Sequence, residues 1–224
     1  MILQLTALLM SLLAAFSMSL DSLAADLSPN GYLMLVNRDY QLSSSYVPED
    51  LVYPNVKHSS SAYQMRADAA QALEELFAAA KEAGYTLYAH SGFRSYETQR
   101  NIYERKIKNT RNLAQARLLV ADPGCSEHQL GLAMDVKNSP DGALNSAFGK
   151  TKEGIWLAEN AWRFGFIIRY REEWTEVTGY AYEPWHIRYV GKEHAAVLQE
   201  MDIPLEQYVE TLRGLAADAY IEGD

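Results

Sequence analysis

The ten residues 126–135 read Ser-Glu-His-Gln-Leu-Gly-Leu-Ala-Met-Asp, and they indicate a loop that runs into a β-strand. The strand is predicted over residues 131–137, where small and apolar residues follow the loop. Successive side chains of a strand point to opposite faces, so Asp135 lies on one face and its neighbours on the other. The segment therefore places an imidazole, His128, on a loop and a carboxylate on the adjoining strand.

Helical and extended patterns are interspersed on both sides of this strand. Apolar stripes with a period near 3.6 and good N-cap residues predict helices over 63–83, 95–108, 113–120, 152–164 and 192–212. Short runs of aromatic and β-branched residues predict strands over 85–91, 131–137, 166–170 and 185–190. We expect Pro204 to interrupt the last helix. No repeat and no low-complexity linker is present, so a single α+β domain is predicted.

Composition excludes several classes of protein. The chain has 224 residues, 48% of them hydrophobic, which is enough for one well-packed domain. Its formal net charge is −9, which argues against nucleic acid and against an anionic membrane surface as the main partner. The only cysteine is Cys125, so an intramolecular disulfide is impossible. We expect a monomer.

The N-terminal segment indicates export. Residues 2–20 carry no charged side chain, and the small residues Ser22 and Ala24 suit cleavage by a signal peptidase. A secretory signal over residues 1–24 is therefore predicted, with the mature protein periplasmic or secreted. No Lys or Arg precedes the apolar run, so an uncleaved membrane anchor over the same residues stays open, as does a buried core helix. The remaining residues, 25–224, form the predicted domain, and residues 25–62 form an extended arm over its surface.

Two histidines and one aspartate form a candidate metal site. His128, Asp135 and His186 match the ligand number of a catalytic zinc site, in which the fourth position is left for water. A structural zinc site would need four ligands, usually with several thiolates, and Cys125 alone cannot supply them. Two adjacent strands of one sheet could bring Asp135 and His186 together.

Acid–base chemistry is indicated close to the third ligand. Glu183 precedes His186 by three residues in Glu-Pro-Trp-His, where it could take a proton from an attacking water without binding the metal. Arg94 could stabilise a substrate carboxylate or the oxyanion of the transition state. Each of these side chains could instead be an ordinary surface or turn residue. These separate explanations would have to account for three clusters at once, so the functional interpretation is favoured.

The other candidate side chains have no such neighbours along the chain. His90 is predicted to line the site or to pack, and His58 and His194 are predicted to lie at the surface. Cys125 shows no Cys–His–acid pattern and is predicted to take no part in catalysis.

Three fragments of the chain resemble the signatures of the VanY-type D-alanyl-D-alanine carboxypeptidases, which belong to the LAS group of zinc peptidases. The resemblance covers roughly residues 30–200, with the fragments in the same order and at suitable spacing. The fragments are Ser-Gly-Phe-Arg-Ser-Tyr-Glu-Thr-Gln (91–99), Ser-Glu-His-Gln-Leu-Gly-Leu-Ala-Met-Asp (126–135) and Glu-Pro-Trp-His (183–186). The implied fold is of the LAS/hedgehog-like type, a small α+β domain whose central antiparallel sheet carries the zinc site and is flanked by helices.

The resemblance also implies roles for individual residues. It implies a Zn²⁺ ion held by His128, Asp135 and His186. Glu183 would be the catalytic base, and Arg94 would stabilise the substrate or the oxyanion. Gln99 and Ser126 would contact the substrate.

The implied function is removal of the C-terminal D-alanine from peptidoglycan stem peptides. D,D-carboxypeptidase action on pentapeptide stems is favoured, and L,D-carboxypeptidase action on tetrapeptide stems stays open. Export disfavours a dipeptidase that acts on free D-Ala-D-Ala, because that dipeptide is made in the cytoplasm. An endopeptidase that cuts cross-links and a non-catalytic wall-binding module are further alternatives. The presence of Glu183 favours an enzyme, since a binding module needs no base beside its metal.

Overall fold

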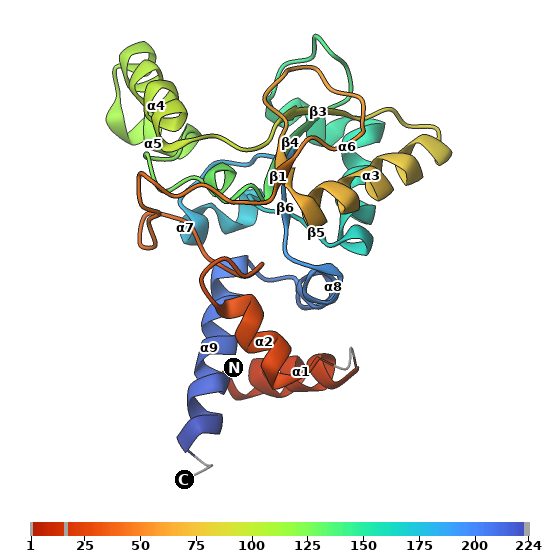
Figure 1. The fold of residues 1–224 in the computed structure, drawn as a ribbon, viewed down its shortest axis with the longest axis vertical. Helices are drawn as coiled ribbons and strands as arrows, with labels where there is room; N and C mark the ends of the chain where they lie inside the picture. The colour runs from red at the N-terminus through yellow and green to blue at the C-terminus, as the bar shows by residue number, and fades with distance from the viewer. Residues whose placement is uncertain (1, 16–17, 222–224) are drawn as a thin grey trace.

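The computed structural model describes residues 2–15 and 18–221, and its centre is an antiparallel sheet (Figure 1). Within these residues the main sheet has the strand order β3-β4-β6-β5, and each neighbouring pair is antiparallel. The strands are β3 (Tyr88–Ser91), β4 (Ala133–Lys137), β5 (Phe166–Ile168) and β6 (His186–Tyr189). Helices flank the sheet, so the predicted α+β class with a central antiparallel sheet is confirmed.

Helix α3 (Ala67–Glu82) supplies much of the core on one face of this sheet. Its apolar stripe includes Leu73 and Leu76, both fully buried with Met134 of β4 and Ile187 of β6 in one hydrophobic cluster. Full burial of a leucine side chain contributes about 1.5–3 kcal/mol. Because side chains alternate along a strand, the residues next to Met134 and Ile187 point to the opposite face, where the candidate ligands lie.

The helix predicted over residues 63–83 begins four residues before the observed start of α3 at Ala67. Residues 63–66 are not helical, because Met65–Arg66 (β2) pairs with Leu51–Val52 (β1) in a small two-stranded sheet. The apolar stripe does not distinguish the strand from a helix at this point, because Met65 is apolar and fits the helical stripe, although it is buried here as part of β2.

Further helices follow α3 along the chain. They are α4 (Tyr96–Thr110), α5 (Leu113–Leu119), α6 (Lys152–Asn160), α7 (Thr175–Thr178), α8 (Lys192–Met201) and α9 (Leu205–Ile221). The Ser95 hydroxyl accepts a hydrogen bond from the backbone N–H of Thr98 at 3.2 Å, which confirms it as the N-cap of α4. The predicted break of the last helix is confirmed, with Asp202 in the left-handed conformation just before Pro204. Figure 1 shows α4 and α5 on the opposite side of the molecule from α3 and α6.

The N-terminal residues form two helices beside the end of the chain. Helices α1 (Ile2–Ala15) and α2 (Leu20–Leu27) lie next to α9 (Figure 1), and Leu9, Leu13 and Leu23 are buried with apolar residues of α8 and α9. Among the described residues, no helix combines the length and apolar character needed to cross a bilayer. The export signal over residues 1–24 stays a prediction.

The predicted arm is largely irregular, but it is not confined to the surface. Leu33 and Leu35 are buried in the cluster around α8 and α9, and Val36 and Leu42 are buried in the cluster around α3. The arm therefore joins the two hydrophobic clusters. Its apolar residues lack a regular period, so their burial could not be predicted from the sequence pattern.

Candidate metal centre

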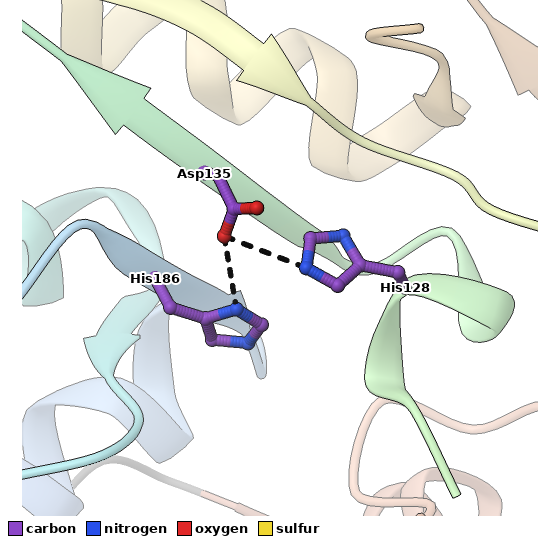
Figure 2. Close-up of side chains that lie close together, drawn as sticks. All are labelled: His128, Asp135 and His186. Atoms are coloured by element: carbon purple, nitrogen blue, oxygen red, sulfur yellow. Dashed lines mark hydrogen bonds and ion pairs between the residues drawn. The ribbon is translucent and has the colours of Figure 1, made fainter. Parts of the chain in front are cut away.

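Strand pairing brings two of the predicted ligands together. Asp135 of β4 lies directly opposite His186 of β6 in the antiparallel register. His128 reaches the same place from a 3₁₀ turn over Glu127–Leu130, which precedes β4. Figure 2 shows both imidazoles directed at the carboxylate of Asp135. The three side chains predicted to form one site are thus placed together, and all three are buried.

The distances from each imidazole nitrogen to the shared carboxylate oxygen are those that a zinc ion requires, and all three ligand atoms lie within 4.8 Å of one another. The His128 Nε2 atom lies 3.4 Å from Asp135 Oδ1, and the His186 Nδ1 atom lies 3.2 Å from the same oxygen. Tetrahedral zinc with bonds of about 2.0–2.1 Å places neighbouring ligand atoms about 3.3 Å apart. Two imidazole nitrogens and one carboxylate oxygen are also the donor set of known catalytic zinc sites. The residues therefore fit the ion.

Hydrogen bonds to the far side of each ring determine which nitrogen faces the metal. The His128 Nδ1–H donates to the carbonyl oxygen of Gly92 at 2.7 Å, which leaves Nε2 with a free lone pair. The His186 ring has the opposite arrangement, since its Nε2 lies 3.3 Å from Glu127 Oε2 and donates to it. The Nδ1 atom of His186 is then the one available for a metal ion.

The charges around these ligands are strongly coupled. Burial lowers the pKa of His128 to about 4, with a further contribution from Arg94, so this imidazole is neutral at neutral pH. Burial also opposes charge on His186, but its hydrogen bonds to Asp135 and Glu127 outweigh burial and raise its pKa to about 9. Burial would raise the pKa of Asp135, yet His128 and Arg94 hold it well below its ordinary value. His186 must therefore lose a proton before its Nδ1 atom can bind a metal.

Glu127 belongs to a buried ion network behind the site. Its Oε1 atom accepts hydrogen bonds from Arg169 Nε at 2.8 Å and Arg188 Nη1 at 2.7 Å. Arg169 also donates to the carboxylate of Glu206 on α9, at 2.9 Å from Nη1 and 2.5 Å from Nη2. Glu127, Arg169 and Arg188 are at most 1% exposed. The two carboxylates and two guanidinium groups of this network balance in charge. The guanidinium groups of Arg169 and Arg188 keep Glu127 ionised, and as a carboxylate it accepts the hydrogen bond from His186.

We predict that Glu127→Gln weakens zinc binding by about 10- to 100-fold, the range found for outer-contact residues of metal sites. The two arginines would keep the amide oxygen of glutamine on their side, so its NH₂ group would face His186 Nε2. That contact favours the tautomer with the proton on Nδ1, the atom needed for the metal. Competition with a chromophoric chelator measures the affinity.

Glu206→Gln is the matched control for this prediction. It removes one charge from the same network without touching His186. Equal zinc affinities in the two variants would contradict an orienting role for Glu127.

Arg94 is anchored at the edge of the same site. Its Nη2 donates to Asp135 Oδ2 at 2.6 Å, and its Nε donates to the Ser91 hydroxyl at 2.8 Å. Gln99 lies behind it, with its Oε1 3.4 Å from Arg94 Nη1 and its Nε2 donating to the Ala121 carbonyl at 2.8 Å. Ser126 lines the cleft beside these residues. The guanidinium is thus fixed beside the metal ligands, and direct substrate contact by Gln99 and Ser126 stays a prediction.

Glu183 lies in the wall of the same cleft. Its carbonyl oxygen accepts the backbone N–H of His186 at 3.0 Å, and Pro184 is buried between them. This tight turn places Glu183 beside the third ligand in the cleft lining, and the described residues show no hydrogen bond between its carboxylate and His186. Burial raises the pKa of Glu183 to about 7, with a further increase from Asp135 and a decrease from His186. A carboxylate with a pKa near 7 is suited to exchange protons at neutral pH.

The cleft in front of these groups has a volume of about 470 Å³. Its wall also includes Trp185 and His90, and for His90 the sequence left both a site role and a packing role open. The cleft is open to solvent on one side, while the three ligands form its buried floor. A peptide end could therefore enter and reach the ligands, Arg94 and Glu183 together.

Two site residues were missed in the sequence, and one surface prediction was wrong. Glu127 stands inside the 126–135 fragment, but its partners Arg169 and Arg188 are 42 and 61 residues away, so only the fold shows its role. Tyr170 packs against the His186 ring with centroids 4.9 Å apart and lines the cleft. His194, predicted at the surface, is 2% exposed, and its ring contacts the Tyr208 hydroxyl at 2.7 Å.

Comparison with known proteins relates this site to a family. Residues 62–192 match the model of the family described as VanY, D-alanyl-D-alanine carboxypeptidase. The chain is 44% identical to YodJ of Bacillus subtilis (strain 168), a protein named as a carboxypeptidase, over 198 residues. That alignment covers 86% of this chain and 72% of the Bacillus protein.

Two solved structures have the same fold. The LdcB LD-carboxypeptidase is 46% identical with a TM-score of 0.76, and the match covers 82% of this chain and 87% of that one. A mutant of the vancomycin resistance D,D-pentapeptidase VanY, from the VanB-type resistance cassette, was solved in complex with Zn(II). It is 35% identical with a TM-score of 0.68, over 80% of this chain and 98% of that one.

Proposed function

Since the chain belongs to the VanY family of D-alanyl-D-alanine carboxypeptidases, we propose that it is a zinc carboxypeptidase that removes the C-terminal D-alanine from peptidoglycan stem peptides, with D,D-carboxypeptidase action favoured. The observation that carries the proposal is the convergence of a metal ligand set, a carboxylate and a guanidinium in one cleft. The zinc-bound structure of the related D,D-pentapeptidase supports the cofactor. A site with this content is an enzyme site, because a binding module has no use for Glu183.

Different side chains of the cleft have different roles in the hydrolysis. A zinc ion held by His128, Asp135 and His186 would supply Lewis-acid chemistry at the scissile carbonyl. Glu183 takes a proton from the attacking water as the new C–O bond forms. It then returns that proton to the amine as the C–N bond breaks, which releases D-alanine. Arg94 stabilises either the negative charge that develops on the carbonyl oxygen or the terminal carboxylate of the substrate.

L,D-carboxypeptidase action on tetrapeptide stems is the second candidate. The observation in its favour is the greater similarity to LdcB, at 46% identity, than to the D,D-pentapeptidase, at 35%. The two activities differ in the residue that precedes the terminal D-alanine. That residue would lie near Leu144 and the 180–182 segment, which both line the cleft.

The deciding experiment supplies purified zinc-loaded protein with pentapeptide, tetrapeptide and cross-linked dimeric muropeptides in one mixture, followed by mass spectrometry. We expect loss of a single alanine, blocked by a chelator and restored by zinc. The stem that is consumed separates D,D from L,D action. Cleavage of cross-linked dimers without release of alanine would favour the endopeptidase, and no cleavage by the zinc-loaded protein would favour the wall-binding module.

We also infer an extracytoplasmic location, either periplasmic or secreted, because peptidoglycan lies outside the cytoplasm and residues 2–20 lack charged side chains. The N-terminal sequence of protein recovered from cell fractions tests this. A new N-terminus near residue 25 supports a cleaved signal, and an intact one in the membrane fraction supports an anchor. The expected monomer is tested by light scattering of the purified protein.

A further inference from the structure

One face of helix α4 forms the wall of the cleft beyond Arg94. Gln99, Ile102, Arg105 and Lys106 all line the cleft, with the three- and four-residue spacing of side chains on one helical face. Gln99 stands at the Arg94 end of this wall, and Lys106 stands seven residues further along the helix. At 1.5 Å per residue, these two positions are about 10 Å apart along the axis.

The charges along this wall are not balanced. The only carboxylates that line the cleft are Asp135 and Glu183, among the residues that the structure describes. Asp135 is paired with Arg94 at 2.6 Å. Within residues 2–15 and 18–221, neither Arg105 nor Lys106 makes an ion pair. The positive charge of Lys106 reaches into the cleft, since it acts on Glu183 to lower the pKa of that carboxyl.

This excess of positive charge contrasts with the rest of the protein. The chain as a whole has a formal net charge of −9, yet two cationic side chains that line the cleft have no ion-pair partner within the described part of the chain. A cleft of one sign concentrates ligands of the opposite sign and orients them. The complementary group is therefore an anion on the part of the substrate that extends from the metal along α4.

We propose that Arg105 and Lys106 form a subsite for a second carboxylate of the substrate, carried about three residues before the terminal alanine. An extended peptide spans about 3.3–3.6 Å per residue, so about 10 Å corresponds to three residues. This subsite rests on the proposed carboxypeptidase activity. It would make the enzyme prefer stem peptides that carry an acidic residue. A carboxylate at this place accepts hydrogen bonds from both cations, whereas its amide loses the charge.

The test compares matched peptides that end in D-alanine and carry either glutamate or glutamine two or three positions before it. Zinc-loaded full-length protein should cleave the glutamate peptide with a kcat/KM about five- to tenfold higher, the size of effect expected from a partly exposed ion pair or two. The double variant Arg105→Gln/Lys106→Gln should bring this ratio close to one. Lys108→Gln, which removes one positive charge at an exposed site on the same helix outside the cleft, should keep the ratio.

The possible outcomes distinguish failure of the acidic subsite from failure of the proposed carboxypeptidase activity. Cleavage of both peptides at equal rates by the wild type overturns the acidic subsite and leaves the carboxypeptidase in place. The same holds if the double variant keeps the preference. If neither peptide is cleaved and muropeptides also remain intact, the carboxypeptidase fails and the subsite fails with it. A preference that declines as salt is raised supports the electrostatic origin.

Discussion

His186→Ala is expected to lose zinc and hydrolysis together. His186 would supply one of the three protein ligands found among the described residues, and its Nδ1 atom is 3.2 Å from the shared oxygen of Asp135. Two ligands cannot hold the ion against free chelators. We expect zinc affinity to fall by more than about 100-fold, beyond the range caused by outer contacts. His128→Ala should behave in the same way, and atomic absorption after dialysis measures the metal content.

An exposed histidine provides the control for the ligand variants. His58 lies at the surface and makes no contact with the three ligands, so His58→Ala should retain full zinc content. Full metal content in His128→Ala or His186→Ala would remove that residue from the ligand set.

Glu183→Gln is expected to keep zinc and to lose turnover. The carboxylate lies in the cleft wall outside the ligand set, so an uncharged isostere leaves the metal site intact. Glutamine cannot accept a proton from the attacking water. We expect kcat to fall by about 100-fold or more, the scale of a general base, and Glu183→Ala should behave alike. Steady-state release of D-alanine, with zinc content measured on the same sample, provides the comparison.

Glu176→Gln is the matched control, because Glu176 is an exposed carboxylate in the nearby helix α7 and lies outside the cleft. Turnover at the wild-type level in Glu183→Gln would end the role of Glu183 as base. Loss of zinc in that variant would instead place the carboxylate among the metal ligands.

The ligand set could be predicted because its signal is local. His128 and Asp135 are seven residues apart in one fragment, and Glu183 and His186 are three apart in another. The alternation of residues along β4 then places Asp135 on the face away from the core. The same local logic located the N-cap at Ser95 and the helix break before Pro204.

What the sequence did not reveal depends on contacts between distant segments. The role of Glu127 requires two arginines that come later in the chain, Arg169 just after β5 and Arg188 in β6, and no local pattern identifies them. His194 was predicted at the surface because no other candidate site residue stands near it along the chain, but Tyr208 and Asp26 satisfy its ring in the interior. The apolar arm residues were missed for the same reason, since Leu33 and Leu35 pack in the cluster around α8 and α9, and Val36 and Leu42 pack in the cluster around α3.

Because two of the candidate ligands come from β4 and β6, zinc binding has to follow the pairing of these strands during folding. Asp135 and His186 are 51 residues apart and meet only when the two strands have paired, so an unfolded chain has no preformed site. An ion that binds only the folded chain stabilises it, by about 4 kcal/mol when free zinc is 1,000 times the dissociation constant. A chain that crosses a membrane unfolded would thus take up its metal where it folds. The zinc supply of that compartment would then determine how much of the protein stays folded there.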